Sequence, residues 1–483
     1  MMDLHWPSVA HARMSPMKQR SFALILAIVL AHSTAWAQAA RTPPPAPSFS
    51  LAQALQYALD HYPSVRSALE EVNASTASVG IAKAMYLPRL DTLWVTNRAT
   101  ANNIFGQLPP QSVVPSISGP VLPASAHSIW GSAVGGLLSW EPFDFGLRGA
   151  TVREAEAAVV RARAEQDLTR LTVQTAVGGA YLAVVSAQQA IVAAEADVAR
   201  RRTLAQAAQT LADNQLRPGA DATRAAAERA AADTRAIQAR RALTIAHTML
   251  AQLLGIADGT VTVSGADLLK QPAEDAAPPP SPHPVLRSGE AAVDLARTRE
   301  SVLAATYRPR VYLQSSVFAR GSGANADGTF EGGADGLAPE RANWATGVQV
   351  VFPNVFDLAG VRARRAAASA STRAESARYD EAALAVTGQR RTAGAMVAAA
   401  LAIAQNTPIQ LAAARQSETQ ARARYDAGLT GIVEVAEAQN LLTQAEYQDA
   451  AARVDVWRAL LAQAVASGDL APFIGRLRAP GVP

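Results

Sequence analysis

The apolar positions of the chain follow two different periods in alternating blocks. From residue 51, and again from residue 284, apolar residues recur at the spacing of one helix face. After each of these blocks come two segments rich in Thr, Val, Gly and Trp with almost no helical period, which predicts four strands at Leu90–Ala99, Ser128–Trp140, Arg310–Arg320 and Asn343–Phe352. Long segments with helical period then predict four helices at Gly146–Thr210, Ala220–Leu254, Leu358–Asp426 and Thr430–Ser467.

This order of segments occurs twice. Pro63 and Pro88 are 25 residues apart, as are Pro284 and Pro309. In both copies an Arg follows the first proline by three positions and the second proline directly. The offset between the copies is far above the roughly 20–50 residues of a solenoid repeat. We therefore predict two copies of one unit, which consists of a helix, a strand pair, a long helix, a turn and a second long helix.

The ends of the two units set the predicted domain organisation. At the N-terminus, Lys18 and Arg20 precede an apolar run that is too short for a membrane anchor, and Ala35-Trp36-Ala37 is a cleavage site of the small-x-small type. These features predict a secretory signal peptide, with Met17 as a possible true start. The predicted segments are a signal peptide at 1–37, a Pro-rich linker at 38–49, a first repeat at 50–255, a linker at 256–283, a second repeat at 284–468 and a C-terminal tail at 469–483.

Composition excludes several classes of function. The formal charge is +4 over 483 residues, and because no basic face is clustered we expect no nucleic-acid partner. The chain has no cysteine, which excludes thiolate metal sites, cysteine nucleophiles and a lipid anchor on cysteine. The histidines have no metal-ligand spacing, and no phosphate-binding glycine loop or nucleophile elbow is present. We expect no enzymatic activity and no cofactor.

The predicted strands have the length and aromatic content of membrane strands. Each has about 10–13 residues, against the roughly 9–11 that a tilted strand needs to cross a bilayer. Four tryptophans lie in them, as expected for the aromatic belts of a membrane barrel: Trp94, Trp130, Trp140 and Trp344. The core of an ordinary β-sandwich explains the strands equally well. Four strands cannot close a barrel, so membrane strands would require several chains to share one, and three chains would supply 12 strands.

The long helices also require neighbours. They are rich in Ala and in charged residues, and the longest extends about 95 Å at 1.5 Å per residue. Such helices bury little area each, so they are expected to lie beside others of similar length, in a coiled-coil rod or in a wall around a tube. No run of about 18 apolar residues occurs after residue 40, so no helix of the mature chain is expected to span a bilayer.

These features together resemble the TolC-type outer-membrane efflux proteins, which serve tripartite efflux pumps and type I secretion. The resemblance covers about residues 50–468 and rests, besides the duplicated prolines, on Pro142–Gly146 (PFDFG) and Pro353–Asp357 (PNVFD) at the strand-to-helix junctions, Tyr425–Leu429 (YDAGL) and Ala251–Gly255 (AQLLG). It implies a mainly α chain with a β membrane domain. Three such chains would form a 12-stranded β-barrel in the outer membrane of a Gram-negative bacterium and a 12-helix α-barrel in the periplasm.

The resemblance also implies a function and partners. The homotrimer would passively conduct substrates that an inner-membrane transporter and a periplasmic adaptor (membrane fusion protein) deliver. A conduit for type I protein secretion is an alternative within this class. A periplasmic coiled-coil scaffold without channel activity is the alternative outside it. The sequence does not identify the substrate or the pump.

The resemblance suggests which residues set the pore. Acidic residues that line the closed tip in the family correspond to Glu434 and Glu437, with Asp221 at the matching place in the first repeat. Two rings of carboxylates would filter cations, although acidic residues are also common at helix starts because they suit the positive end of the helix. Thr430 stands where a well-known member has an Arg that locks the tip, and Arg217 is a candidate substitute.

The two turns are expected at the periplasmic tip. Small residues there would allow end-on contact with an adaptor, although turns need Gly and Pro in any case. The candidate contact residues are Arg217, Pro218, Gly219, Gly428, Leu429 and Gly431. The loops Gly106–Ala126 and Gly321–Glu340 are expected to face the exterior.

Overall fold

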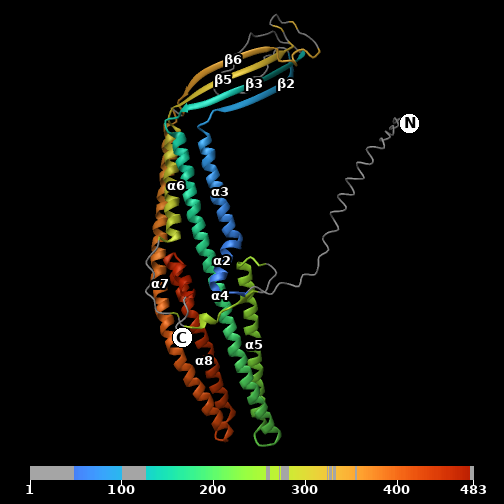
Figure 1. Ribbon diagram of the computed structural model, residues 1–483, viewed down its shortest axis with the longest axis vertical. Coiled ribbons are helices and arrows are strands. Elements are labelled where there is room, and N and C mark those ends of the chain that lie inside the picture. Colours follow the sequence, from blue (N-terminus) through green and yellow to red (C-terminus); the bar gives the residue numbers. More distant parts are fainter. Residues whose placement is uncertain are drawn as a thin grey trace, which may run out of the picture. The chain divides into compact units, whose positions relative to one another are not determined.

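The computed structural model describes most of the chain between Ser48 and Arg478, and Figure 1 shows the order of the elements. The described residues are 48–100, 127–256, 261–270, 272, 282–323, 325, 329, 333–353 and 356–478. The predicted signal peptide, nearly all of the linker at 38–49, the loop Gly106–Ala126 and part of the loop Gly321–Glu340 lie outside them. So do Asn354 and Val355 of the second strand-to-helix junction.

The first repeat begins with two short helices whose starts follow from single residues. Ser50 begins α2 (Leu51–His61) with a capping box, in which its hydroxyl accepts a hydrogen bond from the Gln53 N–H and the Gln53 side chain accepts one from the Ser50 N–H. Pro63 begins α3 (Pro63–Ala84) at the first helical position, where its missing N–H costs no hydrogen bond. The remaining elements of the repeat are β2 (Arg89–Thr100), β3 (Ser128–Phe143), α4 (Leu147–Asp213) and α5 (Gly219–Leu253).

The second repeat has the same order of elements, namely α6 (Pro284–Thr306), β5 (Arg310–Ser322), β6 (Arg341–Val351), α7 (Leu358–Asp426) and α8 (Ile432–Ser467). The helix α7 continues through Pro408 without a break. The last long helix starts at Ile432 rather than at the predicted Thr430, because Gly431 has extended backbone angles and caps the helix.

A set of short elements, which we call the side layer, was not predicted from the sequence apart from its helix α2. It consists of α2, α9 (Ala471–Arg478), the 3-10 helix η1 (Ala266–Leu269) and the parallel strand pair β1 (Ser48–Phe49) and β4 (Thr262–Val263). The side layer packs on α4 and α8 around the largest apolar core. The Tyr181 hydroxyl on α4 donates a hydrogen bond to the Phe49 carbonyl, and the Trp457 indole on α8 donates one to the Lys270 carbonyl.

The four long strands form one antiparallel sheet in the order β2-β3-β5-β6 (Figure 1). The central pair, β3 and β5, joins the two repeats. Trp94 lies opposite Val134, and Trp344 lies opposite Val317, which is itself opposite Gly136. Because side chains alternate between the faces of a sheet, this register places all four strand tryptophans on one face. The edges of the sheet, β2 and β6, have no further partner strand among the described residues.

The helices pack in a row with α4 at its centre. The first half of α4 contacts α3 and α6, and its second half contacts α5 and α8. The helix α7 contacts α6 and α8. The row therefore ends in α3 and α5 on one side and in α7 on the other.

Two helices differ from the expectation about membrane spans. α4 and α7 each contain a window of 18 residues that is apolar enough and low enough in charge to cross a bilayer by composition. With 67 and 69 residues, both helices extend about 100 Å at 1.5 Å per residue, against about 30 Å of hydrocarbon in a bilayer. Alanine supplies much of the apolar character of both, so the windows are weak evidence for a transmembrane helix.

Candidate functional site at the helix turns

The turns between α4 and α5 and between α7 and α8 have the same backbone geometry. Gln215 and Gly428 both adopt positive φ, at 58° and 73°. In each turn the next N–H bonds to a carbonyl five residues back, from Leu216 to Leu211 and from Leu429 to Arg424, which is the Schellman arrangement at a helix C-terminus. Gln215 thus occupies the position of Gly428, although a residue with a Cβ is less stable in this conformation than glycine.

Arg217 joins the turn of the first repeat to the turn of the second. Its guanidinium lies 5.1 Å from the centroid of the Tyr425 ring, and its Nη2 is 3.5 Å from the Tyr425 carbonyl oxygen. Tyr425 is the last residue but one of α7 and is 3% exposed. It packs in a small apolar cluster with Ile432 and Val435 of α8 and with residues of α4 and α5. The sequence identified Tyr425 only as part of a turn motif.

Asp221 acts on the same tyrosine electrostatically. Burial raises the pKa of Tyr425, and the negative charge of Asp221 raises it further. The Tyr425 hydroxyl is buried without a hydrogen-bond partner among the described residues. Asp221 is also the acidic residue in the first turn of α5, and Pro218, the N-cap of that helix, has no side-chain cap. The Asp221 carboxylate therefore lies at the N-terminus of α5, where the free N–H groups of the helix favour a negative charge.

The two glutamates of α8 differ in their surroundings. Glu434 forms an ion pair with Arg424 of α7, with 3.2 Å between Oε1 and Nη1. Glu437, one helix turn further on, is exposed, and no cation within the described part of the chain pairs with it. The sequence predicted their shared helix face but not Arg424. Within one chain the structure thus joins Arg217 and Asp221 to Tyr425, whereas Glu434 is engaged separately.

A buried ion network ties α4 to α5 and α8 beyond the turns. Asp197 and Arg201 of α4 are each 1% exposed and pair at 2.9 Å. Arg201 also binds Glu228 of α5 and the Asn440 side chain of α8. The second oxygen of Asp197 accepts a hydrogen bond from Arg235 of α5. Burial opposes the ionisation of Asp197, but the hydrogen bonds from Arg235, Thr443 and Arg201 hold its pKa below the usual value.

The tryptophan face of the sheet has the dimensions of a membrane-facing surface. Trp130 and Trp140 lie ten residues apart on β3, or about 33 Å at 3.3 Å per residue. A strand tilted by about 40° would span about 25 Å in that length, which matches the apolar band of a membrane barrel. Trp94 and Trp344 are 79% and 75% exposed and lie between these two levels. The opposite face carries polar residues such as Asp91, Asn97, Gln314 and Gln349.

A sheet with one apolar, tryptophan-bearing face, continued by two long helical hairpins, is the architecture of a channel protein that combines a membrane β domain with a helical domain. Comparisons with known proteins agree. The sequence profile of the outer membrane efflux protein family matches residues 54–256 and 281–468. The chain belongs to this family, and it is an outer-membrane channel for efflux or secretion in a Gram-negative bacterium, with a large periplasmic helical part.

Individual relatives support the same fold. The chain is 26% identical to protein CyaE of Bordetella pertussis over 438 residues, which covers 89% of this chain and 86% of that one. The structure of outer membrane protein VceC from Vibrio cholerae matches with a TM-score of 0.68 at 17% identity, covering 87% of this chain and 96% of that one. The CmeC outer membrane channel of Campylobacter jejuni matches with a TM-score of 0.69 at 15% identity, covering 89% of each chain.

Proposed function

We propose that three copies of this chain form one closed channel. The edge strands β2 and β6 leave their outer N–H and C=O groups unpaired in the described chain, which a lipid environment does not tolerate. Pairing β6 of one subunit with β2 of the next closes a barrel of 12 strands when three subunits take part. The end helices of the row carry exposed apolar residues that fit such contacts: Ile237, Ile245 and Met249 on α5, and Leu384, Ile403 and Ile409 on α7.

In this trimer the helices would continue the barrel as a 12-helix tube across the periplasm. The tube would conduct substrates passively from an inner-membrane pump, and a periplasmic adaptor would join the two. The turns offer the adaptor a surface of small and exposed residues. Leu429 is exposed, and a Cβ added at Gly219 or Gly431 would meet no atom within 4 Å. The observation that carries the proposal is the sheet with one tryptophan face and two unpaired edges, continued directly by the helical hairpins.

The turns would act as the gate of the channel. Glu434 and Glu437 would form two rings of three carboxylates that favour cations. The contact of Arg217 with Tyr425 would hold the α4–α5 hairpin against the α7–α8 hairpin in the closed state. Arg217 would thereby replace the missing Arg at Thr430. Opening would require this contact to break.

Single-channel recordings in planar bilayers test the gate. The double variant E434Q/E437Q keeps the size of both side chains and removes six negative charges from a trimer. Its cation-to-anion permeability ratio, measured from the reversal potential in a KCl gradient, is expected to fall several-fold, with weaker block by trivalent cations. Glu381→Gln, on α7 far from the turns along the chain, is the matched control. An unchanged ratio in E434Q/E437Q would refute the gate, and a protein that inserts as a monomer would refute the trimer.

A further inference from the structure

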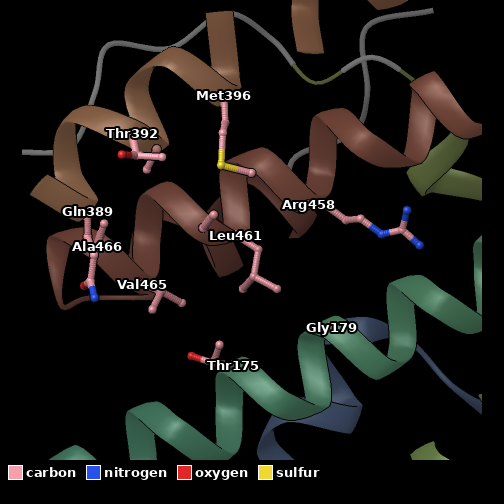
Figure 2. Close-up of a pocket in the computed structure, with 11 residues that line it drawn as sticks. Thr175, Gly179, Gln389, Thr392, Met396, Arg458, Leu461, Val465 and Ala466 are labelled. Atoms are coloured by element: carbon pink, nitrogen blue, oxygen red, sulfur yellow. The ribbon is translucent and has the colours of Figure 1, made fainter. Parts of the chain in front are cut away.

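A pocket of about 530 Å³ lies among α4, α7 and α8 (Figure 2). Thr175 and Gly179 of α4 form one wall, and Thr392 and Met396 of α7 form another. Leu461 and Val465 of α8 point into the space between these helices (Figure 2). This volume is within the range of sites that hold drug-sized molecules.

The pocket is left open by a glycine. A Cβ added at Gly178 would lie 2.9 Å from a terminal methyl group of Leu461, so a larger residue there would force that side chain to shift. A Cβ added at Gly179 would meet nothing within 4 Å, so the adjacent glycine borders open space. Gly178 therefore lies in close contact with α8, whereas the missing side chain at Gly179 leaves the pocket open.

The pocket lies on the side of the helix row that faces away from the side layer. Tyr181 faces the side layer, since its hydroxyl binds the Phe49 carbonyl, and at about 100° per residue Gly179 lies about 200° around α4 from it. On α8, Trp457 faces the side layer through the Lys270 carbonyl. By the same rule Leu461 and Val465 lie about 40° and 80° around α8 from Trp457 and form a floor over the apolar core, whereas Ala466 lies about 180° from it. The exposed lining residues Gly179 and Met396 mark the open side of the pocket.

In the proposed trimer, one side of the helix row faces the interior of the tube. Three copies of the side layer on that side would obstruct the passage, so the side layer belongs on the outside. The pocket then opens to the interior, three times per channel and above the level of the turns. This step rests on the proposed function.

We propose that this pocket is a binding site for small apolar molecules in transit through the channel. Its walls consist mainly of the side chains of Met396, Leu461 and Val465, which suits an uncharged apolar body. Gln389 is a polar lining residue that suits an occasional hydrogen bond, whereas the Thr175 hydroxyl already donates to the Leu171 carbonyl at 2.7 Å. The Arg458 guanidinium points away from the other lining residues in Figure 2 and pairs with Asp455 at 2.7 Å, so the site holds no free charge for an ionic group.

Filling the pocket tests the proposal. Gly179→Leu places a side chain in the open space, and because leucine is a better helix former than glycine the variant should fold. Gly394→Leu is the matched control, since Gly394 also borders open space and lies about 200° around α7 from Met396. The full chain would be reconstituted in lipid nanodiscs and titrated with the uncharged, polarity-sensitive dye N-phenyl-1-naphthylamine, with empty nanodiscs as background. Channel conductance in planar bilayers would be measured for the same proteins.

We expect saturable dye fluorescence from the unaltered chain and from Gly394→Leu, and the loss of most of it in Gly179→Leu. Equal titrations for all three proteins would overturn the binding site. Co-purification of a phospholipid that the dye does not displace would make the pocket a lipid site and would also overturn it. If the proteins conduct ions but show no such difference, the binding site fails while the channel function stands. If none conducts, the proposed function itself fails.

Discussion

Asp197→Ala removes the centre of the ion network that ties α4 to α5 and α8. In the structure the two carboxylate oxygens of Asp197 accept hydrogen bonds from Arg201 at 2.9 Å, Arg235 at 2.7 Å and Thr443 at 2.9 Å. Arg235 is partly exposed and can turn to water. Arg201 is 1% exposed and cannot do so without moving the helices. The variant therefore leaves a buried guanidinium with only Glu228 and Asn440 as partners.

The size of the effect follows from the burial of the pair. Removing one partner of a buried ion pair costs about 3–5 kcal/mol, because the other charge is left without compensation. Exposed pairs contribute about 0–1 kcal/mol. Glu195 provides the control on the same helix, since it pairs with Arg240 of α5 at 2.9 Å and both side chains are more than half exposed. Glu195→Ala is expected to change the free energy of helix separation very little.

Amide hydrogen exchange of the full chain in lipid measures this local free energy. Because exchange tracks the open population when reclosing is fast, a loss of about 3–5 kcal/mol raises exchange in α8 around Asn440 by about two to three and a half orders of magnitude. Glu195→Ala should raise it by less than about tenfold. Exchange in Asp197→Ala that stays within tenfold of the control would refute the claim that the network holds the three helices together.

Three further changes have expected outcomes. The pKa of His283 lies below its usual value because the ring is buried and faces Arg390 and Arg287, so the neutral ring stabilises the fold above the unfolded pKa of about 6.5 and this stability is lost as pH falls below it. The melting temperature should decline from pH 8 to pH 5 more steeply than in His283→Asn. Val317→Arg, on the tryptophan face near the middle of the apolar band, should destabilise the membrane-inserted protein by about 2–4 kcal/mol in a urea titration, and Gln349→Arg on the other face should not. Arg217→Ala should raise the open probability in single-channel recordings, whereas the exposed neighbour Arg224→Ala should leave it unchanged.

The sequence predicted the long elements well because their signals are local. The prolines at 63 and 284 stand at the first helical positions, and the predicted helix Leu358–Asp426 has the bounds of α7. The strands were predicted to within three residues at each end. Apart from α2 the side layer was not predicted, because strands of two residues have no period and their pairing joins Ser48 to Thr262 across more than 200 positions.

The buried charges could not be recognised from the sequence for a different reason. Asp197 and Arg201 are four residues apart on an Ala-rich helix, which is the usual pattern of a solvated ion pair. Their burial depends on the packing of α5 and α8 on α4. Buried alanines of α5 such as Ala225 and Ala232 leave room for the longer side chains of Asp197 and Arg201. Arg424, the ion-pair partner of Glu434, likewise could be identified only once the packing of α7 against α8 was known.

The network and the turns differ in strength, and this difference predicts where the tip would open. Arg217 holds Tyr425 by a ring contact and by a hydrogen bond at the 3.5 Å limit, which together contribute about 0.5–2 kcal/mol. The Asp197 network would cost more to break. Thr443 lies 12 residues beyond Gly431, or about 18 Å along α8. A force on the turns should therefore first separate the two hairpins between the turns and the Asp197 network. The gate is then confined to the last few helical turns, and the helices around the proposed pocket stay in place.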